Sequence, residues 1–538
     1  MLDFASAWEQ VADVVPEREA IVFGERRISY HQFDDAAARF AGALDSAGVR
    51  EGAKVALYLY NCPEYLIAQY GAFKHRAVPV NVNYRYLDEE LVYLIENSDA
   101  EVLVFHSSLS KCVERVRDKL RALRLFVEVD DDGRHLDGTW RFDDLLEAHE
   151  PQPRKSRHVE DLYMLYTGGT TGMPKGVMFR QGEFIESLFL GAVVLGVLRT
   201  VPTDAKSLGR LLGEVSEENR VVSVTCCPLM HGTGMWIGAM GALMTGGTVV
   251  LLGSRSFDAD EVWRLTERER ATRIVIVGDP FARPLLRSLQ AREDEGRPPD
   301  TSSVKYVLSS GAIWSAEIKD QLRSRMTATL SDSLGSTEGL GFGVSRASHS
   351  QGAATAHFAL APDTKVVTEE GAPVTPGSGV AGMLASRTAA YGYYKDPEKT
   401  ARTFITLDGN GYVLTGDWAT VESDGAITLL GRGSMTVNTG GEKVFAEEVE
   451  EAIKRHPLVE DCLVVGVPDE RFGQRVVAVI ASSDPPALTI DQIGDFLRVS
   501  LAHYKIPKAV VIGSSVQRAP NGKADYAWAL RTALATSD

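Results

Sequence analysis

Short apolar segments alternate with helical patterns through the first part of the chain. Val55–Leu59 is typical of a buried strand, Pro63–Lys74 of a helix that begins with proline, and Val78–Val82 of a second strand. Strands that are separated by helices pair in parallel, and helices then cover the sheet. Similar strand patterns return at Ala271–Val277 and Val304–Leu308. The alternation therefore predicts an α/β fold whose large N-terminal region holds parallel and mixed sheets.

The pattern changes twice farther along. Short strands separated by Gly, Pro and Asp between Leu360 and Leu430 indicate an antiparallel subdomain. After Gly431, a charged helix at Ala446–Arg455 and strands such as Cys462–Val467 indicate a small α+β domain. We therefore expect a large domain over residues 1–430, a hinge over 431–435 and a small, mobile C-terminal domain over 436–538. Residues 199–219 are interpreted as a mostly helical insertion of unclear role.

Composition excludes several classes of protein. The 57 Lys and Arg against 73 Asp and Glu give a net charge of −16, without the basic surface that nucleic-acid binding requires. The five cysteines form no CxxC pair, which argues against a disulfide framework or a zinc site and favours a reducing cytoplasm. The N-terminal residues show no signal-peptide pattern. We expect a cytoplasmic protein that does not bind nucleic acid.

One segment, Val221–Ser254, has enough apolar length to span a bilayer, because only His231 in it could carry charge near neutral pH. Glycines interrupt it repeatedly, and Thr245-Gly246-Gly247 is typical of a turn before a strand at Thr248–Leu252. We therefore predict a buried helix and a strand here, and no transmembrane segment. Weak peripheral contact with a membrane stays open.

The run Tyr166–Val177 has the composition of a phosphate cradle. Its four glycines let backbone N–H groups turn toward an anion, its three threonines donate from hydroxyls, and Lys175 adds a positive charge. It is not a Walker loop, because Gly176 follows Lys175 where that loop has Ser or Thr. A plain surface turn is the alternative. The residues predicted to bind phosphate are Thr167, Gly168, Gly169, Thr170, Thr171, Gly172 and Lys175.

Further motifs follow in a fixed order: Pro228–Gly232, Gly335-Ser336-Thr337-Glu338, Thr415-Gly416-Asp417, Gly431-Arg432, Gly440–Val444 and Pro520–Lys523. Together with Tyr166–Val177 they make the chain resemble, over nearly its whole length, the adenylate-forming superfamily of acyl- and aryl-CoA synthetases, luciferases and peptide-synthetase adenylation domains. The resemblance implies that a carboxylate attacks the α-phosphorus of ATP, and that the thiol of CoA then displaces AMP from the acyl-adenylate. It also implies Mg²⁺, since phosphate charge must be neutralised.

The resemblance gives roles to residues of the nucleotide site. Gly335, Ser336 and Thr337 belong to the phosphate motif, and Glu338 is the implied Mg²⁺ ligand, a hard oxygen donor. A solvated surface charge is the alternative for Glu338. Asp417 is implied to hold the ribose hydroxyls with Arg432 nearby, although an Asx-turn cap would also explain Asp417. Gly311 and Ala312 are implied to run along the adenine face.

Three more positions are carried over from the superfamily. Lys523 would reach the carboxylate and the α-phosphate during adenylation and withdraw when the small domain rotates; by itself it would be an inert surface lysine. Gly440 and Gly441 would line the channel for the CoA thiol, where a side chain could not fit. His231 would lie at the mouth of the acyl pocket, with a structural core histidine as the alternative.

Two positions depart from the superfamily pattern. Leu334 stands where an aromatic residue commonly stacks on adenine, and Ser434 replaces a charged residue at the hinge. The leading hypothesis is an AMP-forming acyl-CoA ligase for a hydrophobic acid. Alternatives are a ligase that loads a carrier protein and a non-catalytic nucleotide-binding homologue.

The acid itself is left undetermined by the sequence. The motifs resemble those of actinobacterial-type fatty or steroid-side-chain acyl-CoA synthetases, and no residue reads as a cationic anchor for an amino-acid substrate. The partners expected are the acid, ATP and CoA. The oligomeric state is open, with a homodimer as one candidate.

Overall fold

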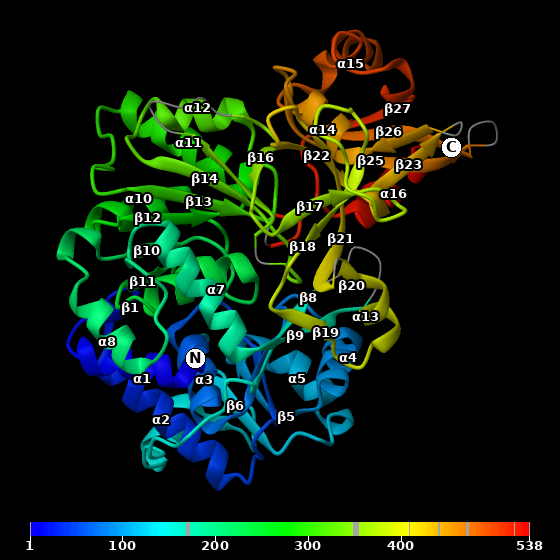
Figure 1. Ribbon diagram of the computed structural model, residues 1–538. Coiled ribbons are helices and arrows are strands. Elements are labelled where there is room, and N and C mark those ends of the chain that lie inside the picture. Colours follow the sequence, from blue (N-terminus) through cyan, green and yellow to red (C-terminus); the bar gives the residue numbers. More distant parts are fainter. Residues whose placement is uncertain are drawn as a thin grey trace.

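The structure is a computed structural model that describes residues 2–167, 173–339, 341–347, 354–407, 409–439, 442–469, 473–520 and 522–536 (Figure 1). Near the N-terminus, parallel strands form a sheet in the order β4-β3-β5-β6-β7. Its strands are β3 (Lys54–Tyr58), β4 (Val78–Asn81), β5 (Ala100–His106), β6 (Leu125–Val129) and β7 (Trp140–Arg141). The helices between and beside them are α2 (Tyr30–Ser46), α3 (Pro63–His75), α4 (Asp88–Ser98), α5 (Ser110–Val116) and α6 (Phe142–Ala148). The predicted strand, helix, strand sequence at residues 55–82 is confirmed.

A long mixed sheet forms the centre of the molecule. Its parallel part comprises β1 (Glu19–Phe23), β11 (Thr248–Leu251), β10 (Val222–Thr225), β12 (Arg273–Ile276), β13 (Tyr306–Ser310) and β14 (Thr329–Leu334), with β2 (Arg26–Ser29) antiparallel at its edge. Its antiparallel part continues through β15 (Gly343–Ala347), β16 (His357–Leu360), β22 (Ile427–Arg432), β21 (Asn410–Val421), β18 (Gly382–Ser386), β17 (Thr364–Val367) and β20 (Phe404–Leu407). The expected antiparallel subdomain is therefore continuous with the parallel strands.

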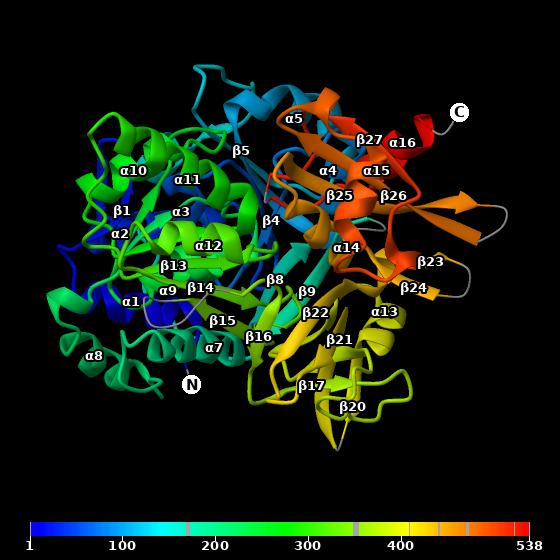
Figure 2. The ribbon, with the colours of Figure 1, turned by 90° about the horizontal axis from the view of Figure 1, so that it is seen from above.

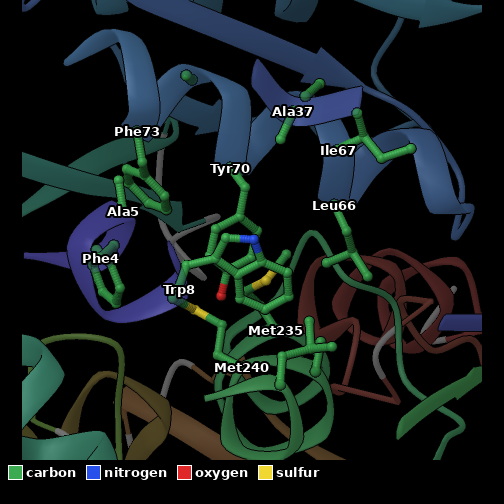
Figure 3. Close-up of a cluster of buried hydrophobic side chains, with 14 of the residues drawn as sticks. Phe4, Ala5, Trp8, Ala37, Leu66, Ile67, Tyr70, Phe73, Met235 and Met240 are labelled. Atoms are coloured by element: carbon green, nitrogen blue, oxygen red, sulfur yellow. The ribbon is translucent and has the colours of Figure 1, made fainter. Parts of the chain in front are cut away.

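Helices cover the two faces of the parallel part. One face packs against α10 (Ala259–Arg268), α11 (Gly278–Asp294) and α12 (Ala316–Arg323) through a buried apolar cluster. The other face is covered by α1 (Phe4–Val14), α7 (Gln181–Val194) and the π-helix η4 (Thr233–Met240) with the short α9 (Gly241–Leu243). Figure 3 shows the core on this side, where Trp8 and Tyr70 lie against Met235 and Met240.

The apolar segment 221–254 is thus divided into β10, η4, α9 and β11, and no helix in the part of the chain that the structure describes is long and apolar enough to cross a membrane. Residues 199–219 contain α8 (Ala205–Gly213) and a short 3-10 turn at Glu217–Asn219. Leu208, Leu211 and Leu212 of α8 are buried in the same core as α1. This segment therefore packs against the N-terminal helix.

A smaller antiparallel sheet, β8 (Leu162–Thr167), β9 (Lys175–Arg180) and β19 (Ala390–Tyr393), joins the N-terminal part to the antiparallel part, and α13 (Pro397–Thr403) follows it. The C-terminal elements form a separate unit, orange to red in Figures 1 and 2, beside the antiparallel end of the long sheet. They are β23 (Thr436–Thr439), β24 (Glu442–Phe445), α14 (Ala446–Lys454), β25 (Val459–Asp469), β26 (Gly473–Ser482), α15 (Ile490–Leu497), β27 (Ala509–Gly513) and α16 (Tyr526–Ala535). The predicted small α+β domain is confirmed.

Candidate active site

One large cavity, of about 1380 Å³, lies where the three parts of the molecule meet. Ser310 and Gly311 reach it from the end of β13, and Ser333 and Gly335 from the end of β14. Lys523 reaches it from the C-terminal domain. In α/β proteins the carboxyl ends of parallel strands are where ligands bind, because the strand order leaves a crevice there. The cavity is therefore the candidate active site.

The predicted phosphate segment leaves the sheet beside this cavity. Thr167 ends β8, Lys175 begins β9, and the two residues pair across the hairpin. Thr167 lines the cavity, while the Lys175 ammonium lies 2.8 Å from a carboxylate oxygen of Asp396. The hairpin is closely packed at Gly176, because a Cβ at this position would stand 2.7 Å from the sulfur of Met164. The predicted residues Gly168, Gly169, Thr170, Thr171 and Gly172 lie outside the described residues.

The second phosphate motif follows β14. Gly335, Ser336 and Thr337 line the cavity, and the backbone N–H of Gly339 donates to the Ser336 hydroxyl at 3.1 Å. Gly311 adopts a left-handed φ of +98° at the end of β13, a conformation that glycine takes without strain. Gly311 lines the cavity too, so the predicted adenine-face segment and the phosphate motif border the same space.

Glu338 is held in a defined position. The Tyr393 hydroxyl donates to Glu338 Oε1 at 2.7 Å, and the Thr388 hydroxyl donates to the Glu338 carbonyl oxygen. Burial and the adjacent Glu338 carboxylate raise the pKa of the Tyr393 hydroxyl, so it stays protonated as a donor. Burial and the neighbouring Lys175 lower the pKa of Lys399, and the Glu338 charge acts in the opposite direction.

These side chains suit a divalent cation. Glu338 offers a hard carboxylate oxygen beside a segment that is lined for phosphate, and Mg²⁺ is characteristically held by one or two carboxylates together with phosphate oxygens and water. Lys399 lies near both Lys175 and Glu338, and the two lysines would neutralise phosphate charge. The chemistry of this donor set therefore fits Mg²⁺ with a nucleotide.

Asp417 and Arg432 are brought together by strand pairing. Asp417 on β21 lies opposite Arg432 on β22, and Asp417 is 6% exposed. Two sequence-distant motifs thus meet at one level of the antiparallel sheet, as a shared ribose contact requires. The other predicted pair, Gly440 and Gly441, lies outside the described residues.

Lys523 and His231 come from different domains and face the same cavity. Burial, together with the positive charge of Lys523, lowers the pKa of His231 to about 3. The His231 Nε2 atom is buried without a hydrogen-bond partner among the described residues, so the imidazole is neutral and available to a ligand. His231 therefore lines the cavity in which it is predicted to lie, and its role at the acyl pocket stays a prediction.

The turn that carries Lys523 is anchored on both sides. The Arg518 guanidinium donates to the Gly522 carbonyl at 3.0 Å and to Asp461 of β25. A Cβ on Gly522 would stand 3.2 Å from Pro280 of α11, so this turn packs closely against the large domain. The small domain is therefore docked with Lys523 pointing into the candidate site.

Sequence reasoning missed three contributors to the site. The buried Asn81 amide donates to the carbonyl oxygens of Tyr166 (2.8 Å) and Met230 (2.7 Å), which ties the phosphate hairpin to the segment before His231. Tyr393 positions Glu338, and Asp396 holds Lys175. The only sequence signal for Asn81 is that it is a polar residue at the end of an apolar strand. The contacts of Tyr393 with Glu338 and of Asp396 with Lys175 join residues far apart in sequence, so no local pattern predicts them.

The apolar residues on and near the cavity wall divide into two groups. Trp236 and Ile237 line the cavity, but Met235, Met240 and Trp314 are buried in the apolar cores. Other apolar lining comes from α7, through Leu190, Val194 and Leu195. The cavity therefore has an apolar branch next to its polar, phosphate-lined end.

Comparisons with known proteins identify the family of this chain. The family of AMP-binding enzymes matches residues 8–394, and the AMP-binding enzyme C-terminal domain matches residues 448–523. A medium/long-chain fatty acid–CoA/3-oxocholest-4-en-26-oate–CoA ligase of Mycolicibacterium smegmatis is 38% identical, with 98% of this chain and 96% of that protein covered. A 3-oxocholest-4-en-26-oate–CoA ligase of Rhodococcus rhodochrous is also 38% identical, with 98% and 95% covered.

The fold is shared with a solved enzyme. The crystal structure of ATP-bound MatB from Rhodopseudomonas palustris superposes with a TM-score of 0.81 at 23% identity, and 99% of each chain is covered. The chain therefore belongs to the AMP-binding enzymes, within the adenylate-forming acyl-CoA synthetase superfamily.

Proposed function

We propose that this enzyme activates a hydrophobic carboxylic acid with ATP and transfers the acyl group to CoA. The observation that carries the proposal is the single cavity in which Lys523, the phosphate motif Gly335–Thr337 and an apolar branch along α7 meet. Two reactants that are bound side by side react as if their effective concentration were very high. The relatives that act on fatty and steroid acids support the same substrate class.

In the first half-reaction, a carboxylate oxygen attacks the α-phosphorus of ATP and pyrophosphate leaves. We assign the phosphates to Thr167–Gly172, Lys175 and Gly335–Thr337, the adenine face to Gly311 and Ala312, and the ribose to Asp417 and Arg432. Lys523 would bring the two anions together by its charge, and His231 would border the carboxylate. Glu338 would hold Mg²⁺, which when bound neutralises charge on the phosphates.

In the second half-reaction, the CoA thiolate attacks the acyl carbonyl and AMP leaves. We propose that residues 431–435 serve as the hinge between domains 1–430 and 436–538, and that Gly440 and Gly441 then line the thiol channel. A short 3-10 turn at Gly433–Met435 separates β22 from β23, and a few residues between two elements are where hinge motions commonly occur.

The test is a panel of carboxylic acids of increasing apolar size, assayed with ATP, Mg²⁺ and CoA for AMP, pyrophosphate and acyl-CoA. Medium- or long-chain and polycyclic acids should give the highest kcat/KM, since each buried CH₂ contributes about 0.8 kcal/mol. Highest activity on acetate would contradict the proposal. Acyl-adenylate without thioester at saturating CoA would favour a carrier protein as acceptor.

We also propose a cytoplasmic location. The cysteines Cys62, Cys112, Cys226, Cys227 and Cys462 are free and buried, as suits a reducing compartment. Fractionation of the native cells tests the location, and recovery in the membrane pellet after a high-salt wash would contradict it.

A further inference from the structure

Arg273 is a buried cation for which the described residues supply no hydrogen-bond partner at Nε and no ion pair. It begins β12, is 4% exposed and lines the candidate cavity. Its Nε atom is buried without a hydrogen-bond partner, and its guanidinium forms no ion pair within the described ranges. Its Nη1 atom lies 3.6 Å from the point where a Cβ on Gly241 would stand, on a wall of the same cavity.

The two lysines that are most deeply buried among the described residues are paired with carboxylates. Lys74 lies 2.9 Å from Glu9 and 2.7 Å from Asp34, and Lys319 lies 3.3 Å from Asp332. Burying an ion without a partner is costly, which is why proteins pair or neutralise such groups. Arg273 is therefore an exception within this chain, and exceptions of this kind point to a ligand.

Arg273 keeps its charge at neutral pH. Burial lowers the pKa of the guanidinium to about 10, and the neighbouring Tyr306 acts weakly in the opposite direction. No carboxylate of the described residues contributes. The cavity wall around Arg273 thus carries a full positive charge in an apolar setting, where a hydrogen bond to an oxygen is strong.

Strand register separates Arg273 from the polar end of the cavity. Arg273 on β12 lies opposite Tyr306 on β13, four residues before Ser310 at the polar end of the cavity. At about 3.3 Å per residue, the two levels are ~13 Å apart along the strands. That separation matches an acid of medium length or a polycyclic acid whose carboxylate lies near Lys523.

We infer that Arg273 determines specificity by binding an oxygen acceptor, a ketone or a second carboxylate, on the end of the substrate opposite the reacting carboxylate. The inference deepens the proposed function and rests on it. A plain alkyl chain would leave the guanidinium desolvated and unpaired, whereas an oxygen acceptor would satisfy it. Arg346 also lines the cavity, but it is exposed and lies three strands away on β15.

The experiment compares matched acids of several lengths that end in a methyl, a ketone or a carboxylate. For each, kcat/KM of acyl-CoA formation and Kd from calorimetry with enzyme alone are measured for the wild type, Arg273→Met and Arg273→Lys. Arg264→Met is the matched control, since Arg264 is an exposed arginine on α10. Thermal unfolding checks that each variant folds.

The wild type should favour the best oxygen-bearing acid over its methyl counterpart by at least about tenfold, because a hydrogen bond to a charged group is worth about 1.5–3 kcal/mol. Arg273→Met should reverse this preference, raising kcat/KM for the methyl acid and lowering it for the oxygen-bearing one. Arg273→Lys should keep part of the preference, and Arg264→Met all of it. The ketone and carboxylate arms show which acceptor is bound.

Two results would overturn the inference: a wild type that favours the methyl acids, or an Arg273→Met variant with the same preference as the wild type. Failure of the proposed function looks different, because no acid would then give acyl-CoA. The calorimetric Kd values would still decide the role of Arg273 in that case. If Arg273→Met does not fold, the Arg273→Lys comparison decides it.

Discussion

Lys523 of the C-terminal domain lies close enough to His231 of the large domain for its charge to lower the pKa of the imidazole. Both side chains line one cavity, and the turn before Lys523 packs against Pro280. A residue near the C-terminus thereby lines a cavity whose walls come mainly from earlier parts of the chain. Because the two side chains come from different domains, their proximity depends on how the domains pack against each other.

The His231 pKa predicts a pH effect on stability. Its pKa is about 3 in the folded protein against 6.5 for an unperturbed histidine, so the unfolded state binds the extra proton first as pH falls. His231 should therefore cost the protein stability from pH 6.5 downward, by about 2 kcal/mol at pH 5, until the loss levels off near pH 3. Thermal unfolding at pH 7.5 and pH 5 should show a smaller loss for His231→Asn than for the wild type; equal losses would refute the burial of a neutral imidazole.

The Glu338–Tyr393 hydrogen bond predicts graded effects on Mg²⁺ use. Glu338→Gln should reduce the rate of pyrophosphate release strongly at any Mg²⁺ concentration, because a charged hard ligand is lost. Tyr393→Phe removes only the hydroxyl that holds Glu338 Oε1, and it should raise the Mg²⁺ concentration needed for half-maximal rate by about 10–100-fold. Titrations of Mg²⁺ at fixed ATP distinguish the two. Unchanged curves for both variants would remove this pair from the metal site.

Asp417 predicts an effect on nucleotide affinity. Asp417→Ala should raise the KM for ATP by about tenfold or more, because two charge-assisted hydrogen bonds to ribose would be lost. Asp424→Ala is the matched control, since Asp424 lies exposed in the turn between β21 and β22. Equal KM values for the two variants would indicate that Asp417 only caps its own turn.

Gly433 predicts an effect of side-chain size at the proposed hinge. A Cβ at this position would stand 2.6 Å from the Trp418 indole nitrogen, so alanine does not fit the docked arrangement. Gly433→Ala should therefore slow adenylation, which needs Lys523 in the cavity, more than it slows thioester formation from supplied acyl-adenylate. Adding Trp418→Phe to the Gly433→Ala variant should restore part of the lost adenylation rate, because it removes the nitrogen-bearing ring. Equal slowing of both steps would contradict the hinge role.

Local patterns predicted local structure well. The strands and helix expected at residues 55–82 agree with β3, α3 and β4 to within one residue at each end, because burial on both faces of a parallel sheet makes such strands apolar throughout. Motif order also led us to expect Gly311, Gly335 and Lys523 in one site, and all three line the same cavity. The nucleotide roles of these residues stay predictions.

Tertiary contacts could not be predicted from the sequence patterns. Arg273 begins an apolar strand, where an arginine is ordinarily a solvated end residue, and only the packing of η4 and α9 across the sheet buries it. Met235, Trp236 and Met240 are apolar residues of one π-helix. The two methionines are buried in the core with the N-terminal helix, whereas Trp236 also lines the cavity. The spacing expected for an α-helix does not apply to a π-helix, so the sequence could not distinguish them. The contacts of Glu338 and Lys175 likewise join separate elements.

The most direct test of the account separates the two half-reactions in Lys523→Ala, with Lys508→Ala, an exposed lysine of the same domain, as control. Acid-dependent pyrophosphate release and the conversion of supplied acyl-adenylate and CoA to thioester are each measured in single turnover. The account predicts that Lys523→Ala nearly abolishes pyrophosphate release, because a charge-assisted contact at the transition state is worth orders of magnitude, and that it retains thioester formation. Equal loss of both half-reactions in the folded variant, or full pyrophosphate release, would contradict it.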